Sequence, residues 1–550
     1  MRRLLLPLCR LPPTAGLALL LIGGAAFQPA RAQALPGAGG YTVRGTVLND
    51  ATDQPVARAE VILGGEDAQL TASDGSFSFD AVATGTHRLS IRRPGYLGFG
   101  NGRSRESGPP RSILVGPEMP ALTFRLTPLA AISGHLSLST ADPADHIRVT
   151  LFRRVFQNGR SRWSRASVTE SRSDGSFRLA NLLPGSYRVF TAASLDDPNE
   201  DSRGPMWGFP ALYYPGVTDV GSAGVLILKA GQQAQADMTL VRQRFFPVTI
   251  TVRGMPPAPT SFEVADTDGR STGLPVRFDL RTEIAHANVP NGSWILIAHA
   301  FGVPMRFGRA DFQVASAPVD LAVAVAPIPP IPVEINRDFT STADGSLPLN
   351  RGPGMTLDLA PADEFAAGGG LQLSRSGQDG GASKYEIRVF QPGKFWIDTT
   401  NFPFTYVASV TSGGSDLATT PLTVNPSSST PPIEVTLRND PGTISGQIDS
   451  SSPGGAGSSG EQPRIWIYAI PLFPTTSHLR EAAFLGNGQF SLPNLAPGSY
   501  RVVACDAPQE IDFHSAEGLA AWSGKGQVIS LAPNGTANVE LTVTHGEPAP

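Results

Sequence analysis

The sequence predicts an all-β protein built from tandem β-sandwich modules, and three observations carry that prediction. The 550-residue chain is rich in Gly (59) and Pro (50) and poor in charged residues (16%), which suits short strands joined by many turns. A sixteen-residue phrase at 175–190 returns at 488–503, with an earlier copy beginning at Gly75 and degraded copies around Pro290 and Tyr385. Within the phrase, apolar and polar residues alternate with the period of two that indicates half-buried strands.

The chain begins with the pattern of an export signal. Arginines at positions 2 and 3 precede an apolar run at 15–26, and Ala30-Arg31-Ala32 is a small-x-small cleavage site. Residues 1–32 are therefore expected to be a signal peptide, with Gln33 starting the mature chain. The alternative is an N-terminal membrane anchor, although the run is short for spanning a bilayer. The expected destination is the periplasm, the cell surface or the extracellular space.

Cysteine usage adds one constraint. Cys9 precedes the apolar run and would leave with the signal, so the mature chain carries only Cys505. No intramolecular disulfide is then expected, and Cys505 is interpreted as a small buried apolar residue.

Each copy of the phrase is interpreted as a hairpin-like pair of strands. In the copy at 175–190, Phe177 and Tyr187 fall on the apolar side of the alternation. Between them, Leu-x-Pro-Gly-Ser resembles a turn in which proline presets the first dihedral and glycine accepts a positive φ. The first module also shows an opening strand at 41–47 and a closing strand at 122–126. Short strands with frequent turn signals indicate β-sandwiches.

Five modules follow from this spacing, the second with an aromatic loop insertion and the third and fourth with degraded repeats. Their expected ranges are 41–128, 131–242, 245–328, 331–438 and 442–546. The stretch 451–460 is low in complexity and is expected to be a flexible surface loop of the last module.

The first module resembles the carboxypeptidase regulatory-like domain family. The resemblance is carried by Val43–Val47, Pro55–Val61, Ser73–Phe77, Gly85–Leu89 and Pro94–Tyr96. It implies a small, transthyretin-like β-sandwich that is not itself catalytic. The tandem arrangement, together with Tyr213–Gly216, resembles exported bacterial proteins of the acidobacterial kind. The resemblance thus implies a fold and a compartment, and no peptidase activity.

The sequence offers no motif for catalysis, a metal or a cofactor. Its eight histidines form no His-Glu-x-x-His, and neither a Gly-x-Ser-x-Gly elbow nor a phosphate-binding loop occurs. Asp266–Gly269 resembles the start of a calcium loop, but the twelfth position is Arg277 where a bidentate Glu is needed. The net charge of −4 provides no basic footprint for nucleic acid. We therefore expect no enzyme, no cofactor, no metal site and no nucleic-acid partner.

The strongest candidate for a binding surface is the insertion at 196–216. It contains Trp207, Phe209, Tyr213 and Tyr214, and planar aromatics can stack on sugar rings or anchor a protein partner. Sugar binding predicts that these rings are exposed and coplanar. The favoured alternative is that they cap their own sandwich or wedge against the next module, which predicts that they are buried at a module boundary.

A second unusual stretch, 148–165, contains six arginines with aromatic residues between them. Its alternation predicts a long hairpin turning at Asn158-Gly159. The arginines could meet acidic polysaccharide or lipid headgroups, but we favour the solvated face of an edge hairpin.

These patterns favour a non-catalytic exported protein that serves as a scaffold or spacer at or outside the cell envelope, with adhesion or a protein partner as its role. Two alternatives remain open at this stage. One is carbohydrate binding through the aromatic platform, with a polysaccharide as partner. The other is an accessory chain acting with a separate enzyme. The sequence identifies no ligand and no oligomeric state.

Overall fold

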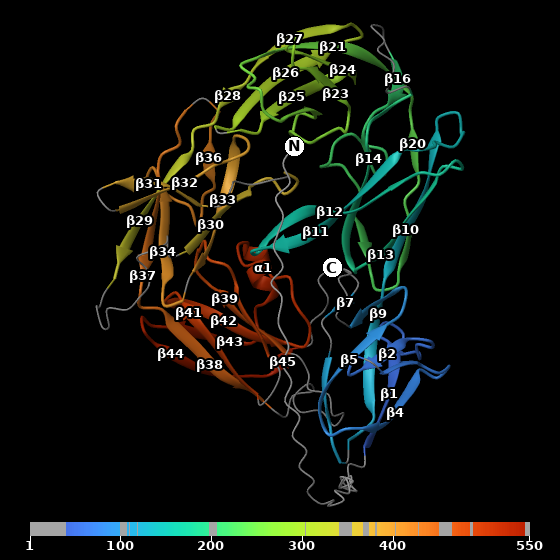
Figure 1. Ribbon diagram of the computed structural model, residues 1–550, viewed down its shortest axis with the longest axis vertical. Helices are drawn as coiled ribbons and strands as arrows, with labels where there is room; N and C mark the ends of the chain where they lie inside the picture. Colours follow the sequence, from blue (N-terminus) through green and yellow to red (C-terminus); the bar gives the residue numbers. More distant parts are fainter. Residues whose placement is uncertain are drawn as a thin grey trace, which may run out of the picture.

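The computed structural model describes residues 40–544 apart from 66, 100–106, 109–110, 118, 197–205, 303, 340–354, 367–372, 380–381, 402, 427, 450–464 and 485–487. The regular secondary structure of the described residues is almost entirely β-strand, with one short helix, α1 (Ala516–Ala521) (Figure 1). The predicted all-β fold class is thus confirmed. The expected signal peptide at 1–32 and the low-complexity stretch 451–460 lie outside the described residues. The ranges expected above are kept as names for the five modules.

The first module is a sandwich made from one folded-over sheet. Its strands are β1 (Tyr41–Asn49), β2 (Glu60–Leu63), β3 (Asp67–Leu70), β4 (Ser76–Val82), β5 (Gly85–Arg92), β6 (Tyr96–Phe99), β7 (Ser107–Gly108), β8 (Arg111–Val115) and β9 (Leu122–Pro128). The strand order is β3-β2-β5-β6-β9-β1-β4, with β7 on β6 and β8 on β5. Because β6 joins the two halves, their inward side chains share one core.

The second module has two separate sheets. Its strands are β10 (Ala130–Leu138), β11 (Arg148–Gln157), β12 (Arg160–Glu170), β13 (Ser176–Leu182), β14 (Gly185–Thr191), β17 (Leu212–Tyr213), β18 (Leu226–Leu228), β19 (Gln233–Gln235) and β20 (Met238–Leu240). One sheet has the order β13-β10-β19 with β20 on β10, and the other β12-β11-β14-β17 with β18 on β14.

The third module includes two strands from the range expected for the second: β15, just before the 196–216 insertion, and β16, within it. Its strands are β15 (Ser194–Leu195), β16 (Met206–Phe209), β21 (Gln243–Arg253), β22 (Thr260–Ala265), β23 (Val276–Asp279), β24 (Ile284–Pro290), β25 (Gly292–Ala300), β26 (Arg306–Val314), β27 (Val319–Ala324) and β28 (Ala326–Pro327). The sheets run β15-β16-β21-β24-β23, with β27 on β21, and β22-β25-β26-β28. The chain therefore enters the third module's sheet before the second module is complete.

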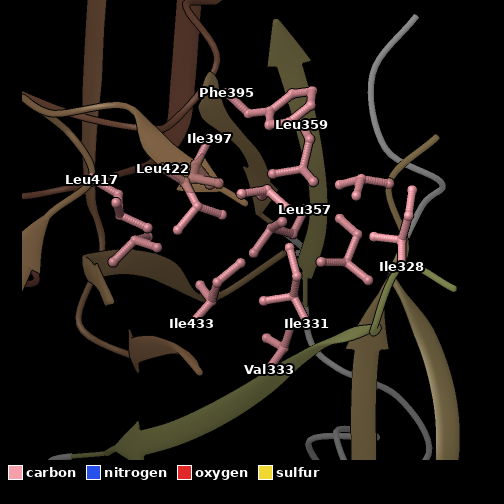
Figure 2. Close-up of a cluster of buried hydrophobic side chains, with 14 of the residues drawn as sticks. Ile328, Ile331, Val333, Leu357, Leu359, Phe395, Ile397, Leu417, Leu422 and Ile433 are labelled. Atoms are coloured by element: carbon pink, nitrogen blue, oxygen red, sulfur yellow. The ribbon is translucent and has the colours of Figure 1, made fainter. Parts of the chain in front are cut away.

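The fourth module packs directly on the third. Its strands are β29 (Ile331–Asp338), β30 (Met355–Pro361), β31 (Ser374–Asp379), β32 (Ala382–Ile387), β33 (Gly393–Asn401), β34 (Tyr406–Ser412), β35 (Ser415–Asp416), β36 (Leu422–Val424) and β37 (Ile433–Arg438). Figure 2 shows its core, where Leu357, Ile397 and Ile433 converge from different strands. Ile295 and Phe307 of the third module belong to the same buried cluster, so the two modules share a continuous apolar contact.

The fifth module carries the helix. Its strands are β38 (Gly442–Ile448), β39 (Ile465–Pro471), β40 (Arg480–Phe484), β41 (Gln489–Leu495), β42 (Gly498–Cys505), β43 (Gln527–Leu531), β44 (Thr536–Leu541) and β45 (Val543–Thr544). The segment that leads into α1 adds a second small core around Tyr468, Phe513 and Trp522. Cys505 is completely buried in that core.

The repeated phrase forms an arch between two sheets, so the hairpin-like pairing expected from the sequence is wrong. β13 pairs with β10 and β14 pairs with β11, and these belong to different sheets. The chain passes from one layer to the other at two residues. Asn181 lies in a bulge and has a positive φ, and Gly185 has a φ of 149°. All five modules have a glycine at this point: Gly85 (φ 131), Gly185 (φ 149), Gly292 (φ 146), Gly393 (φ 158) and Gly498 (φ 152).

The ring two residues after each arch glycine closes the arch. In four modules the side chain at this position donates, through a hydroxyl or a ring N–H, to the carbonyl four residues earlier: Tyr187 to Leu183 (2.6 Å), Tyr500 to Ala496 (2.7 Å), Trp294 to Pro290 (2.9 Å) and His87 to Ala83 (2.8 Å). The fourth module has Phe395 at this position, which is buried but has no polar atom to donate. Tyrosine and tryptophan thus bury an apolar ring while satisfying a turn carbonyl.

The phrase's other aromatic ring explains a recurring glycine in the opening strand. A Cβ on Gly45 would lie 2.6 Å from Cζ of Phe77, and one on Gly446 would lie 2.8 Å from Cζ of Phe490. Gly134 and Phe177 repeat the arrangement. Phe77 and Phe177 are buried, at 5% and 3% exposure, so these rings occupy the core side as predicted, directly against a strand that has room only for glycine.

Candidate functional site

The most developed junction between modules is formed by the β11–β12 hairpin, which projects from the second module toward α1 (Figure 1). The two strands pair continuously from Arg148↔Glu170 to Gln157↔Arg160, with one register shift. Asn158 and Gly159 form the tip with φ values of 48° and 74°, as a two-residue turn of this sequence requires. The predicted turn is therefore present, and its tip contacts two other modules.

On the fourth module the tip is held by a buried carboxylate. Asn158 Nδ2 donates to Asp398 Oδ1 at 2.7 Å, and Arg160 Nη1 donates to the same oxygen at 3.1 Å. The Arg160 guanidinium lies over the Trp396 ring, 4.4 Å from its centroid. The side chains of Asp398 and Arg160 are only 7% and 13% exposed. Burial raises the pKa of Asp398 despite these donors, and burial lowers the pKa of Arg160 despite Asp398.

On the fifth module the tip packs against a ring and a neutral histidine. A Cβ on Gly159 would lie 2.3 Å from the Phe513 ring, so the turn backbone rests directly on that ring. Arg160 Nη2 lies 3.4 Å from His514 Nδ1, and His514 Nε2 lies 3.1 Å from the Asn158 carbonyl. A guanidinium can only donate, so Nδ1 accepts and Nε2–H donates. Burial lowers the pKa of His514 to about 4, and the Arg160 charge adds to the effect.

Nearer its base, the hairpin binds a loop of the fourth module. The Trp163 ring stacks on Phe365 with centroids 5.5 Å apart and an interplanar angle of 9°. The backbone N–H of Trp163 donates to the Glu364 carbonyl at 2.9 Å, and Arg162 Nη2 donates to the Ala366 carbonyl at 2.9 Å. The Arg188 guanidinium lies over Trp163, 4.6 Å from the ring centroid. This junction combines aromatic stacking with satisfied backbone groups.

The expectation that the hairpin arginines form a solvated face is wrong for three of them. Arg160 and Arg162 bond to the fourth module, and burial lowers the pKa of Arg162. Arg153 lies 3.6 Å from Glu510 of the fifth module, and burial raises the pKa of that carboxyl. Arg154 and Arg165 are exposed. The physical reason is that the hairpin's tip inserts between modules, so alternation along the strand does not separate water from protein there.

The four aromatic residues of the insertion lie in different environments. Trp207 is 43% exposed, whereas Tyr213 is buried at 5%. Tyr213 packs on Phe190 with centroids 4.9 Å apart, and burial raises its pKa to about 12. Phe209 and Tyr214 are half-buried and pack against the second module's core.

Trp207 lies on β16, as Phe209 does, whereas Tyr213 lies on β17 and Tyr214 follows it. β16 pairs with β21, so Trp207 lies on the third module's sheet opposite Arg244. The guanidiniums of Arg242 and Arg244 lie over its ring, 5.1 and 5.6 Å from the centroid. Among the described residues of the insertion, one indole is exposed and flanked by two cations, and the four rings do not form a common platform.

The other polar candidates are accounted for by local structure. Asp266 Oδ1 accepts from the backbone N–H groups of Asp268 and Arg270, which closes a turn. Within the described ranges, no group of three or more His, Cys, Asp and Glu side chains is placed to hold a metal ion. No helix in the same ranges is long and apolar enough to cross a membrane.

The comparisons with known proteins identify the first module. Residues 42–102 match the family model of the carboxypeptidase regulatory-like domain, so the first module carries such a domain, as the resemblance implied. No curated protein matches the chain.

Among solved structures, a streptococcal ancillary pilin is 9% identical, with 52% of this chain and 100% of that chain covered and a TM-score of 0.20. The minor pilin of Streptococcus agalactiae is 12% identical, with 36% of this chain and 95% of that chain covered and a TM-score of 0.17. The shaft pilin SpaA of Lactobacillus rhamnosus GG is 11% identical, with 37% of this chain and 100% of that chain covered and a TM-score of 0.14. Likeness at this level carries no argument about function, and the fold assignment rests on the strands themselves.

The partners of the hairpin are the residues that sequence reasoning missed. Asp398, Phe365 and His514 are each isolated in their own segments. The contacts with these segments join residues 203 or more positions apart in the chain. The one available signal was the length of the hairpin itself, which at ten and eleven residues per strand exceeds what its own sandwich uses.

Proposed function

We propose that this protein is an exported, non-catalytic scaffold whose modules are held in a closed arrangement to present surfaces to a protein partner at or outside the cell envelope. The observation that carries the proposal is the hairpin junction. A spacer needs only contacts between consecutive modules, whereas here Asn158 and Arg160 of the second module bond to Asp398 of the fourth and His514 of the fifth. Such contacts fix the relative positions of modules that are not neighbours in the sequence.

The composition of the junction supports a structural role. Burying an arginine beside an aromatic ring or a carboxylate costs desolvation free energy unless its donors are hydrogen-bonded. Such contacts favour one arrangement of the modules over others more than they add net stability. The two anchoring side chains from the tip meet on a single oxygen of Asp398. A surface of this kind supports a fixed geometry between modules, as a scaffold requires.

Export is the second part of the proposal and rests on the signal pattern of residues 1–32. Cell fractionation with N-terminal sequencing tests it. The expected result is a mature chain starting at Gln33 outside the cytoplasm. A full-length chain in the cytosolic fraction would contradict it.

The closed arrangement is tested by small-angle X-ray scattering of the whole chain at neutral pH. We expect a compact particle for the wild type and a larger radius of gyration for Arg160→Glu, because a carboxylate would face Asp398 in a buried site. Arg165→Glu is the matched control on the exposed side of the same hairpin and should scatter as the wild type does. Equal radii for all three proteins would remove the support for a closed scaffold.

Carbohydrate binding is a second candidate, favoured by one observation: Trp207 is a large exposed aromatic beside the polar side chains of Arg242 and Arg244. A glycan array with the mature chain tests it, with Trp207→Ala as the variant. Phe404→Ala is the control, since Phe404 is an exposed aromatic on another module. Binding that is lost only in Trp207→Ala would place carbohydrate recognition ahead of protein scaffolding.

A further inference from the structure

The fifth-module contact of the hairpin depends on a histidine that must stay neutral. Nδ1 of His514 accepts from Arg160 while Nε2 donates to the Asn158 carbonyl, so both ring nitrogens are already used. Protonation of Nδ1 would replace an acceptor with a donor 3.4 Å from a guanidinium nitrogen. Two cations would then face each other in a largely buried site, where water screens them poorly.

We propose that the β11–β12 hairpin is an acid-released strap: protonation of His514 detaches its tip from the fifth module and allows the second and fifth modules to separate. The proposal rests on the closed arrangement described above and adds the condition under which it opens. The tip's other contact with the fifth module among the described residues, Gly159 against Phe513, is apolar packing. The Arg153–Glu510 pair joins the same two modules farther from the tip.

The charged groups around His514 come from three elements. From the hairpin, Arg160 faces it directly, and Arg153 lies farther along with Glu510. On its own segment, Asp512 accepts from the backbone N–H of His514 and so offers partial compensation for an imidazolium. From the fourth module, Asp398 acts through Arg160. Asp358 of the fourth module and His478 of the fifth act in turn on Asp398.

The sign of the effect follows from where the proton binds better. The pKa of His514 is about 4 in the closed form, against an ordinary value of 6.5 when exposed. Above pH 6.5 the ring is neutral in both forms and does not oppose closure. As the pH falls from 6.5 toward 4, only the open form takes up the proton, so the closing equilibrium weakens by up to roughly 300-fold.

Protonation of Asp398 has the opposite effect on the closing equilibrium. Burial raises the pKa of Asp398, so the closed form takes up a proton at this carboxyl more readily than the open form does. Its titration therefore favours closure as the pH falls through that raised value. The two contributions are separated by changing His514 alone.

The test is fluorescence energy transfer between dyes at Ser164→Cys and Glu517→Cys, both exposed positions on the hairpin and on α1. The mature chain's own Cys505 is buried and does not compete for the label. We expect transfer efficiency to fall reversibly as the pH is lowered from 7.5 to 4, while circular dichroism shows that the strands persist.

Three variants decide the interpretation. His514→Gln keeps a donor and an acceptor without titrating, and we expect its transfer to stay high across the range. His146→Gln changes an exposed histidine of the second module and should respond as the wild type does. Arg160→Ala should show low transfer at every pH, which keeps the proposal testable if His514→Gln folds poorly.

The outcomes also separate this inference from the scaffold proposal. Low transfer in the wild type at pH 7.5 would contradict the closed arrangement itself. High transfer that persists to pH 4, or an acid response unchanged in His514→Gln, would overturn the strap while leaving the scaffold in place.

Discussion

Substituting the glycine that faces the repeat's phenylalanine tests the packing on which each module depends. In Gly45→Ala, the new Cβ would lie 2.6 Å from Phe77 Cζ and 2.8 Å from the Leu122 carbonyl oxygen. Side-chain carbon atoms do not approach this closely, so either the Phe77 ring or strand β9 must move. Phe77 cannot rotate freely, because its ring centroid lies 6.1 Å from those of both Phe79 and Phe124 in a packed core.

The magnitude follows from two opposing effects. Overpacking of this kind costs about 1–3 kcal/mol, and the reduced freedom of the unfolded chain offsets about 0.4–1 kcal/mol of it. A net loss of about 1–2 kcal/mol corresponds to a decrease of roughly 5–15 °C in the melting temperature of a module this size. Gly116→Ala is the matched control in the same module, since its Cβ would meet nothing within 4 Å.

Differential scanning calorimetry of the whole chain, with hydrogen exchange followed in β1 and β9, measures the effect. We expect Gly45→Ala to lower the temperature of one transition and to speed hydrogen exchange in these two strands. Gly116→Ala should leave both unchanged or slightly raise the transition temperature. If Gly45→Ala and Gly116→Ala have the same melting temperature, the proposed contact between glycine and phenylalanine does not constrain the module.

Three further predictions follow from single contacts. Tyr500→Phe removes the 2.7 Å bond to the Ala496 carbonyl and should destabilise the fifth module by about 1 kcal/mol in calorimetry; an unchanged transition would show that the bond is dispensable, as at Phe395. Burial raises the pKa of the Cys505 thiol to about 11, so iodoacetamide at pH 8.5 should modify it only after guanidinium is added, and full labelling of the folded chain would contradict its burial. Phe365→Ala removes the ring that stacks on Trp163 and should increase hydrogen exchange at 161–164 several-fold without lowering the modules' melting temperatures, whereas unchanged exchange would mean that the stack does not hold the hairpin.

The sequence predicted what repeats within one module. Alternation identified the strands, and Phe177 and Tyr187 face the core as the phrase indicated. The arch was misread as a hairpin because local turn chemistry is the same for both, and only the pairing of β13 with β10 distinguishes them. The bulge residue Asn181 was the available sign that the chain leaves its sheet at this point.

The junction between modules could not be predicted, because its contacts have no sequence period. Arg160 and Asp398 are 238 residues apart, and nothing in either segment indicates the other. The aromatic insertion illustrates the same limit. Its composition indicated one surface, whereas β16 joins the third module and β17 stays with the second, so Trp207 and Tyr213 are placed on different sheets.

The distance between the hairpin and α1 tests the central claim most directly. Double electron–electron resonance between spin labels at Ser164→Cys and Glu517→Cys measures it in the whole chain at neutral pH. The closed arrangement predicts one narrow, short distance in the wild type. In Gly159→Val, the added side chain would collide with Phe513 in a turn that requires a positive φ, and a longer, broader distribution is expected. A broad distribution in the wild type, or the same narrow distance in both proteins, would contradict the account.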